Sequence, residues 1–315
     1  MNGCESGASV YQDGTGGHGA TTPSGTAGTA GAGGVGGAGG PSAVTIGSGG
    51  ASAGCAKVDF LFVIDNSVSM KGEQDALIAS FPGFIDSIKA NIAAKDDYHI
   101  LVADTDDWGK CKIGQSACTG QSLCQEDSNY ICNATFEACD MTIGAGVVHP
   151  AGKGASNQLC QLTGAKRYIQ MGEPDINAAF ACVAQLGLAG HAQERPMDSM
   201  VAALSPAMNA ADACNDGFLR SDALLVVTFI TDEGGNDAGT PQDWYDAVVA
   251  AKSGDENAVV VIGFVAGGAN SDLGKFIALW GKHGFKASVH DPDYSGQFAS
   301  SISLIDEACD NFIPH

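Results

Sequence analysis

The sequence predicts an α/β fold in which a mostly parallel sheet is covered by helices. Three long apolar runs, rich in β-branched and aromatic residues, have the composition of strands buried on both faces: 58–64, 223–230 and 258–265. Segments with helical spacing of apolar residues lie between these runs, and such alternation is typical of a parallel sheet. Without one insertion the body has roughly 200 residues, a normal size for a single domain of this kind.

The other elements follow from the same patterns in chain order. Residues 72–94 place apolar side chains three and four positions apart and predict an amphipathic helix, which Pro82 and Gly83 would kink or interrupt. Residues 98–103 predict a second strand. Further along, the expected elements are short strands at 166–170 and 286–289 and helices at 175–186, 196–211, 241–251, 271–283 and 297–312.

Small oxygen-bearing side chains follow the first buried strand. Asp65, Ser67 and Ser69 occupy alternate positions, and alternate residues of an extended backbone project to the same side. Asp232 comes just after a later buried strand. Ligands of open α/β sheets bind beyond the carboxyl ends of the strands, and hard divalent cations take oxygen ligands. We therefore expect a divalent-cation site there, with an ordinary polar turn as the alternative.

Charge and hydropathy exclude several classes of function. The chain has 15 basic and 36 acidic residues, a net charge of −21, whereas nucleic acid and anionic lipid both demand a basic surface. We expect no nucleic-acid partner. The longest apolar runs are too short to cross a bilayer, so we expect membrane contact only through an N-terminal lipid anchor.

Cysteine usage predicts an oxidising, extracytoplasmic location. The chain carries 11 cysteines, more than a reduced cytoplasm usually holds. Zinc is not expected, because no two cysteines have the C-x₂-C spacing. Residues 107–165 form a polar insertion in which up to three disulfides would staple a small subdomain through six cysteines: Cys111, Cys118, Cys124, Cys132, Cys139 and Cys160.

The first 54 residues predict a disordered tether ahead of a globular domain over residues 55–315. From about residue 14 the segment is almost entirely Gly, Ala, Ser, Thr and Pro, which cannot bury enough apolar area to fold. The start, Asn2-Gly3-Cys4, resembles the end of a bacterial lipoprotein signal, with Cys4 as the acylated residue of a longer reading frame. An accidental free thiol is the equal alternative for Cys4.

The motif Asp65-x-Ser67-x-Ser69, together with Asp232 after Thr231, resembles that of the von Willebrand factor type A domain. The resemblance covers roughly residues 56–312 apart from the insertion and implies a Rossmann-like, three-layer fold. In that family these residues form a metal-ion-dependent adhesion site. The resemblance implies that both serines bind Mg²⁺ (or Ca²⁺ or Mn²⁺) directly, while the two aspartates bind it directly or through water. The family's open coordination position accepts a carboxylate from a partner protein.

The resemblance also implies disulfide pairs. Cys55 stands just before the first strand and Cys309 in the last helix, which matches a terminal staple seen in some members of the family. Cys182 and Cys214 are then the expected partners of each other, as neighbours in the helical layer.

The chain departs from the family in one respect. The family usually supplies a Thr ligand from the loop before a central helix, but residues 187–195 contain no Thr. Glu194 and Ser199 are the candidate replacements. A glutamate would add negative charge, which would favour Ca²⁺ or weaken the binding of a partner carboxylate.

We expect an exported, surface-tethered protein that binds a protein or surface ligand through this cation and that is not an enzyme. No nucleophile elbow, zinc-protease motif or phosphate-binding loop occurs. Two alternatives stay open. One is a structural envelope domain with a vestigial metal site, which the missing Thr favours. The other is a metal-dependent hydrolase in which Asp65, Asp232 and Glu233 activate water.

Overall fold

A computed structural model of the chain describes residues 55–91, 97–105, 137–190, 194–232, 236–268 and 271–314. All of them belong to the unit Gly50–His315. Among the described helices, none combines the length and the apolar character that crossing a membrane requires. Several predictions lie outside the described residues: the tether 1–54 with Cys4, the insertion cysteines Cys111, Cys118, Cys124 and Cys132, and Glu233.

The sheet confirms the prediction of an α/β fold with mostly parallel strands. Its strands lie in the order β3-β2-β1-β4-β5-β6, and all neighbours are parallel except β3, which pairs antiparallel with β2 at one edge. In register, Ile64 lies opposite Asp104 on one side and Ile230 on the other, so three central strands end at the same level. The bounds are β1 (Val58–Ile64), β2 (Tyr98–Asp104), β3 (Ile169–Gln170), β4 (Leu224–Thr231), β5 (Val259–Val265) and β6 (Gly284–Ala287).

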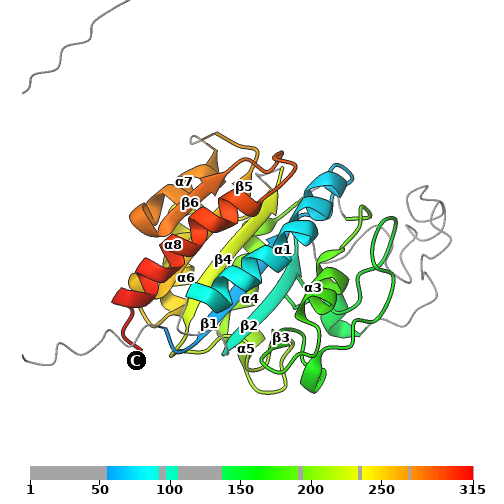
Figure 1. Cartoon of the computed structure of the whole chain (residues 1–315), viewed down its shortest axis with the longest axis horizontal. Coiled ribbons are helices and arrows are strands. Elements are labelled where there is room, and N and C mark those ends of the chain that lie inside the picture. The colour runs from blue at the N-terminus through cyan, green and yellow to red at the C-terminus, as the bar shows by residue number, and fades with distance from the viewer. Residues whose placement is uncertain are drawn as a thin grey trace, which may run out of the picture. The chain divides into compact units, whose positions relative to one another are not determined.

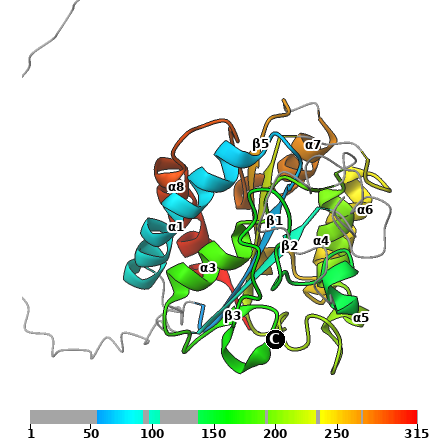
Figure 2. The same cartoon turned by 90° about the vertical axis from the view of Figure 1, so that its right-hand side faces the viewer.

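Helices cover both faces of the sheet because side chains along each buried strand alternate between the faces. In β1, Phe60 and Phe62 pack into one core, while Leu61 and Val63 pack into the other. Figure 2 shows the two layers on opposite sides of the strands, and α1 and α8 lie along the same face in Figure 1. One layer holds α1 (Lys71–Asn91), α3 (Ile176–Ala184) and α8 (Ser295–Asn311); the other holds α4 (Pro196–Leu204), α5 (Pro206–Asn209), α6 (Pro241–Ala251) and α7 (Asp272–Leu279).

Helix α1 continues through Pro82, so the predicted interruption is absent. Proline removes a hydrogen bond from the helix interior and crowds the preceding turn. Aromatic packing beside it offsets this cost. Phe81 stacks on Phe180 with ring centroids 3.5 Å apart, and Phe84 packs edge-on against Phe60 at 5.7 Å. These contacts hold α1 against one face of the sheet on both sides of the proline.

A second proline does end a helix. The predicted helix at 196–211 is divided into α4 and α5, because Pro206 disfavours helical backbone at the residue before it. Ser205 is extended there, with φ −64° and ψ 146°. Its Oγ accepts a hydrogen bond from the N–H of Met208 at 3.2 Å and so caps α5.

Three disulfides join described residues: Cys55–Cys309, Cys139–Cys214 and Cys160–Cys182. The first is the terminal staple that the family resemblance implied. The predicted pairing of Cys182 with Cys214 is corrected, because the two cysteines belong to different layers. Cys182 lies on α3 against the core beneath α1, whereas Cys214 lies in the loop after α5.

The disulfides also correct the prediction of a self-contained insertion. Cys139 and Cys160 both fall within residues 107–165, yet each is bonded to a cysteine outside that segment. A further link comes from Asn215, whose side chain accepts from the N–H of Gly146 at 2.9 Å and donates to the carbonyl of Gly144 at 2.9 Å. The C-terminal part of the insertion is therefore part of the α/β body.

Candidate metal centre

The candidate metal centre lies where the strand order of the sheet reverses. Successive strands run from β1 through β2 to β3 on one side and from β4 through β5 to β6 on the other. In doubly wound sheets, ligands bind at this switch point beyond the carboxyl ends of the strands. Asp65 follows β1, Asp232 follows β4, and these two strands are neighbours in register. The fold therefore brings the two predicted carboxylates to the same edge of the sheet, at the ends of neighbouring strands.

Asp65 is fully buried and held by two hydrogen bonds. Its Oδ1 accepts from the backbone N–H of Ser67 at 2.7 Å, which closes the turn after β1. Its Oδ2 accepts from the hydroxyl of Thr231 at 2.8 Å. Thr231 is the β4 residue level with Asp65, because Ile64 lies opposite Ile230. In the sequence Thr231 stands only as the neighbour of Asp232, and the register between β1 and β4 is the signal that gives it a role.

The two serines of the motif lie beside each other in the turn after β1. The Oγ atoms of Ser67 and Ser69 are 3.1 Å apart. Ser67 is buried and Ser69 is exposed, so the pair spans the boundary between protein and solvent. Val68 between them is 62% exposed. Ser69 therefore lies on the solvent side of the pair, as a ligand of an exchangeable cation should.

Electrostatic repulsion between the two carboxylates favours a cation. Burial raises the pKa of Asp65 to about 6; hydrogen bonds from Ser67 and Thr231 oppose this rise, and the negative charge of Asp232 adds to it. Oδ1 of Asp232 is shielded from solvent and has no hydrogen-bond partner among the described residues. A shielded carboxylate oxygen without a partner is costly. A bound cation would neutralise this repulsion and give that oxygen a partner.

The donor set suits a hard cation. Two carboxylates and two hydroxyls supply only oxygen, which is what Mg²⁺, Ca²⁺ and Mn²⁺ prefer. Within the described ranges, no group of three or more His, Cys, Asp or Glu side chains gathers around a common point. A cation bound at this centre would therefore need the serine hydroxyls and water to complete its coordination.

The loop after α3, from which the resemblance implied a metal ligand, lies against the motif. The N–H of Gly190 donates to the carbonyl of Asn66 at 3.0 Å. A Cβ on Gly190 would stand 2.3 Å from Oδ1 of Asn66, so only glycine fits this approach. Gln74 of α1 bridges the same two segments, because its Nε2 donates to the carbonyls of Asp65 and Gly187, both at 3.0 Å. Sequence analysis missed Gln74, whose helical position carried no sign of this bridge.

The two candidate replacements for the missing Thr have other partners. The hydroxyl of Ser199 donates to the carbonyl of Asp104 at 2.5 Å, which ties α4 to β2. Glu194 is fully buried, and its Oε2 accepts from the hydroxyl of Thr105, which lies 3.5 Å from Oδ1 of Asn66. Glu194 therefore lies near the motif. Thr105, which follows β2, stands between Glu194 and Asn66.

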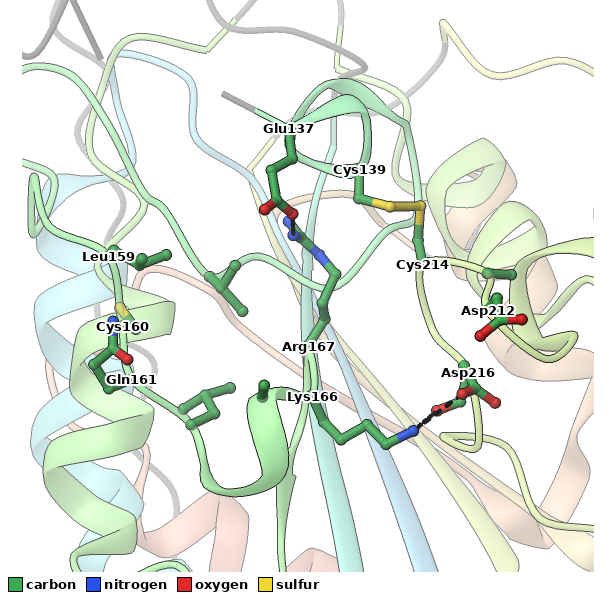
Figure 3. Close-up of a pocket in the computed structure, with 14 residues that line it drawn as sticks. Glu137, Cys139, Leu159, Cys160, Gln161, Lys166, Arg167, Asp212, Cys214 and Asp216 are labelled. Atoms are coloured by element: carbon green, nitrogen blue, oxygen red, sulfur yellow. Dashed lines mark hydrogen bonds and ion pairs between the residues drawn. A yellow bond between two sulfur atoms is a disulfide. The ribbon is translucent and has the colours of Figure 1, made fainter. Parts of the chain in front are cut away.

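A separate cavity of about 520 Å³ lies where the insertion meets the body, and both of its basic residues, Lys166 and Arg167, are paired within the chain (Figure 3). The guanidinium of Arg167 donates to the carbonyl of Gly146 at 2.8 Å and is paired with Asp140. Lys166 lies 3.1 Å from the carboxylate of Asp216. The contacts of Arg167 join the insertion to the body, and both basic groups at this cavity already have partners within the chain.

The sequence matches no protein-family model, and no curated protein is significantly similar to it. The class of the protein therefore has to be inferred from its motif, its strand order and the geometry at the switch point.

Proposed function

We propose that this chain is a von Willebrand A-like binding protein that engages a protein or surface ligand through a divalent cation. The cation would be held by Asp65, Ser67, Ser69 and Asp232. The observation that supports the proposal is the position of Asp65 and Asp232 at the ends of neighbouring strands, where the charge of Asp232 adds to the raised pKa of Asp65 and one oxygen of Asp232 has no partner among the described residues.

The residues around the cation have separable roles in this proposal. The serine hydroxyls and the two carboxylates bind it, and Thr231 with the N–H of Ser67 holds Asp65 in place. The cation supplies an electrophilic position that attracts one further carboxylate, from the ligand. That position would face solvent on the side of Ser69, since Ser69 and Val68 are exposed.

Glu194 has a positioning role in this proposal and is not a ligand of the cation. Its contact with Thr105 orders the end of β2 beside Asn66, in a chain that lacks the family's usual Thr. Keeping this charge out of the coordination shell leaves the cation more electrophilic toward a ligand carboxylate. Mg²⁺ is therefore the expected occupant, with Ca²⁺ and Mn²⁺ as the alternatives.

We also propose that the protein works outside the cytoplasm, tethered by residues 1–54 and anchored through a lipid on Cys4. Three disulfides among the described residues support an oxidising compartment. Attachment at the cell surface suits a binding function, because it holds the domain where ligands outside the cell are met.

Thermal unfolding of the full chain tests the proposed function. In EDTA and then in Mg²⁺, Ca²⁺ or Mn²⁺, the wild type should show a cation-specific rise in Tm, since a cation at 100 times its Kd stabilises by about 2.7 kcal/mol. Ser69→Ala removes one exposed ligand and should abolish the rise. Ser300→Ala, at an exposed serine of α8, is the matched control and should keep it.

Two results would refute the proposal. If no cation raises Tm, the metal centre is vestigial and a structural role for the domain is favoured. If Ser69→Ala and the wild type respond equally, the cation binds elsewhere on the chain.

A further inference from the structure

A cavity of about 290 Å³ lies beside the metal centre, beyond the carboxyl ends of β4 and β5. It shares Thr231 and Asp232 with that centre. Its other walls come from the N-terminal ends of α4 and α7, from α6 and from the segment after β5. A ligand bound to the cation would therefore have this cavity next to it.

The walls of the cavity are largely apolar. Met197, Trp244, Val265 and Leu273 all line it, and each is less than a tenth exposed. The indole N–H of Trp244 donates to the carbonyl of Ala238 at 2.7 Å, so the ring has no donor left for a ligand. These side chains suit an aliphatic chain, and an aromatic face also attracts a cation.

The charged residues that line the cavity are all acidic: Asp232, Asp237 and Asp272. Asp237 is fixed in place, because its Oδ1 accepts from the N–H groups of Met197 at 2.8 Å and Asp198 at 2.9 Å.

Nearby basic groups leave part of this charge unpaired. Lys275 is paired with Asp272 at 2.7 Å, and Arg195 is paired with Asp198 at 3.0 Å. In the described part of the chain, no basic side chain forms an ion pair with Asp232 or Asp237. With Asp232 bound to the cation, Asp237 remains as the acceptor for a positive group.

We propose that this cavity binds a basic side chain, arginine or lysine, of the same protein ligand whose carboxylate binds the cation. The inference rests on the proposed function and names the ligand chemistry: an acidic residue with a basic residue near it. The aliphatic stem lies against Met197, Trp244 and Leu273, and the charged head is next to Asp237. An acidic side chain would be repelled there, and an apolar one would bury Asp237 without giving it a partner.

The test uses n-butylguanidinium, which has the stem and head of arginine without a carboxylate. We expect it to bind the full chain in EDTA and to change the fluorescence of Trp244, while n-pentanol, of similar length but neutral, binds at least about tenfold more weakly. Asp237→Asn keeps an oxygen for the two N–H groups but removes the charge, and it should weaken n-butylguanidinium binding about tenfold.

A matched pair of variants at the mouth of the cavity keeps the test valid if Asp237→Asn fails to fold. Ala266 lines the cavity and is exposed, so the fold tolerates a larger side chain there. Ala266→Lys should weaken n-butylguanidinium binding about threefold and Ala266→Glu should strengthen it about threefold, as expected for one added charge near the surface. Equal binding of n-pentanol, or equal effects of the two variants, would overturn the inference.

Because this titration is run in EDTA, it does not depend on the metal centre. Coupling to the cation is tested with N-acetyl-Asp-Arg-amide and N-acetyl-Arg-Asp-amide, with and without Mg²⁺. At least one of them should bind about tenfold more tightly with Mg²⁺, and Ser69→Ala should remove this gain. If n-butylguanidinium binds and Mg²⁺ has no effect on either peptide, the shared ligand is refuted while the cavity's preference for a cation remains.

Discussion

The hydroxyl of Thr231 donates a hydrogen bond of 2.8 Å to Oδ2 of Asp65, between residues 166 positions apart in the chain. This bond joins the ends of β1 and β4 and orients the carboxylate at the centre of the proposed metal site. It exists because parallel pairing places Thr231 level with Asp65.

Thr231→Val should therefore destabilise the protein and weaken cation binding. The substitution keeps the shape of the side chain but leaves Oδ2 of a buried carboxylate with one partner fewer, at a cost of about 1–3 kcal/mol. Thr231→Ser keeps the hydroxyl and should retain most of the stability. Chemical denaturation of both variants in EDTA measures the effect, and equal stabilities would show that the bond has no structural role.

Gly190→Ala should displace the loop after α3 from the metal motif. The new methyl group would stand 2.3 Å from Oδ1 and 2.6 Å from the carbonyl oxygen of Asn66. We expect a loss of about 1–3 kcal/mol of stability and weaker cation binding. Gly83→Ala is the control, because nothing lies within 4 Å of its Cβ, and in helix α1 it should stabilise by up to about 1 kcal/mol. A Gly190→Ala protein with wild-type stability would contradict the close approach.

Acid should destabilise the protein partly through His99. Burial, with the nearby charge of Arg220, lowers the pKa of His99 to about 4, and its Nδ1 lies 2.8 Å from the carbonyl of Phe218. In the unfolded chain the pKa of this histidine is about 6.5. The contribution of neutral His99 to the stability of the fold is therefore complete above that pH. It is lost as the pH falls toward 4, by on the order of 3 kcal/mol.

The variant His99→Gln isolates this contribution, since an amide N–H can still donate to the carbonyl of Phe218. Its stability should fall less steeply than that of the wild type between pH 6.5 and 4. Asp59 has the opposite effect on the pH dependence of stability, and it does so in both proteins. Burial raises its pKa to about 6 despite the charge of Arg220, so protonation of Asp59 favours the folded state as the pH falls. The control is His290→Gln, at an exposed histidine. If stability falls with pH equally steeply in His99→Gln and in the wild type, the role of His99 is refuted.

Peptide mapping without reduction should recover three links: Cys55–Cys309, Cys139–Cys214 and Cys160–Cys182. Replacing both Cys160 and Cys182 by Ala should cost about 3 kcal/mol, and replacing Cys55 and Cys309 about 5 kcal/mol, because the second pair closes a much longer loop. A peptide that links Cys182 to Cys214 would contradict the structure.

The buried strands were the most predictable part of the fold. Residues 58–64 were expected as a strand and form β1 with those bounds, because a run buried on both faces is apolar throughout. Helix ends were harder to predict. Pro82 and Pro206 have the same intrinsic effect on a helix, and only the aromatic contacts of Phe81 and Phe84 explain why α1 continues while α4 ends.

Part of the candidate site was also predictable. Asp65, Ser67 and Ser69 are close in sequence, and a strand end fixes their direction. The partnership of Asp65 with Thr231 depends on which strands are neighbours, and the bridge through Gln74 depends on the orientation of α1. The partners of Cys182 and Cys214 were not predictable for the same reason, since the layers that separate these two cysteines exist only in the folded chain.

The most direct test of the central claim is the anomalous diffraction of a crystal of the chain soaked in Mn²⁺. The proposed function predicts one strong peak between Asp65, Ser67, Ser69 and Asp232, with a coordination position left for water or a ligand carboxylate. A map with no peak there at a saturating Mn²⁺ concentration would contradict the claim.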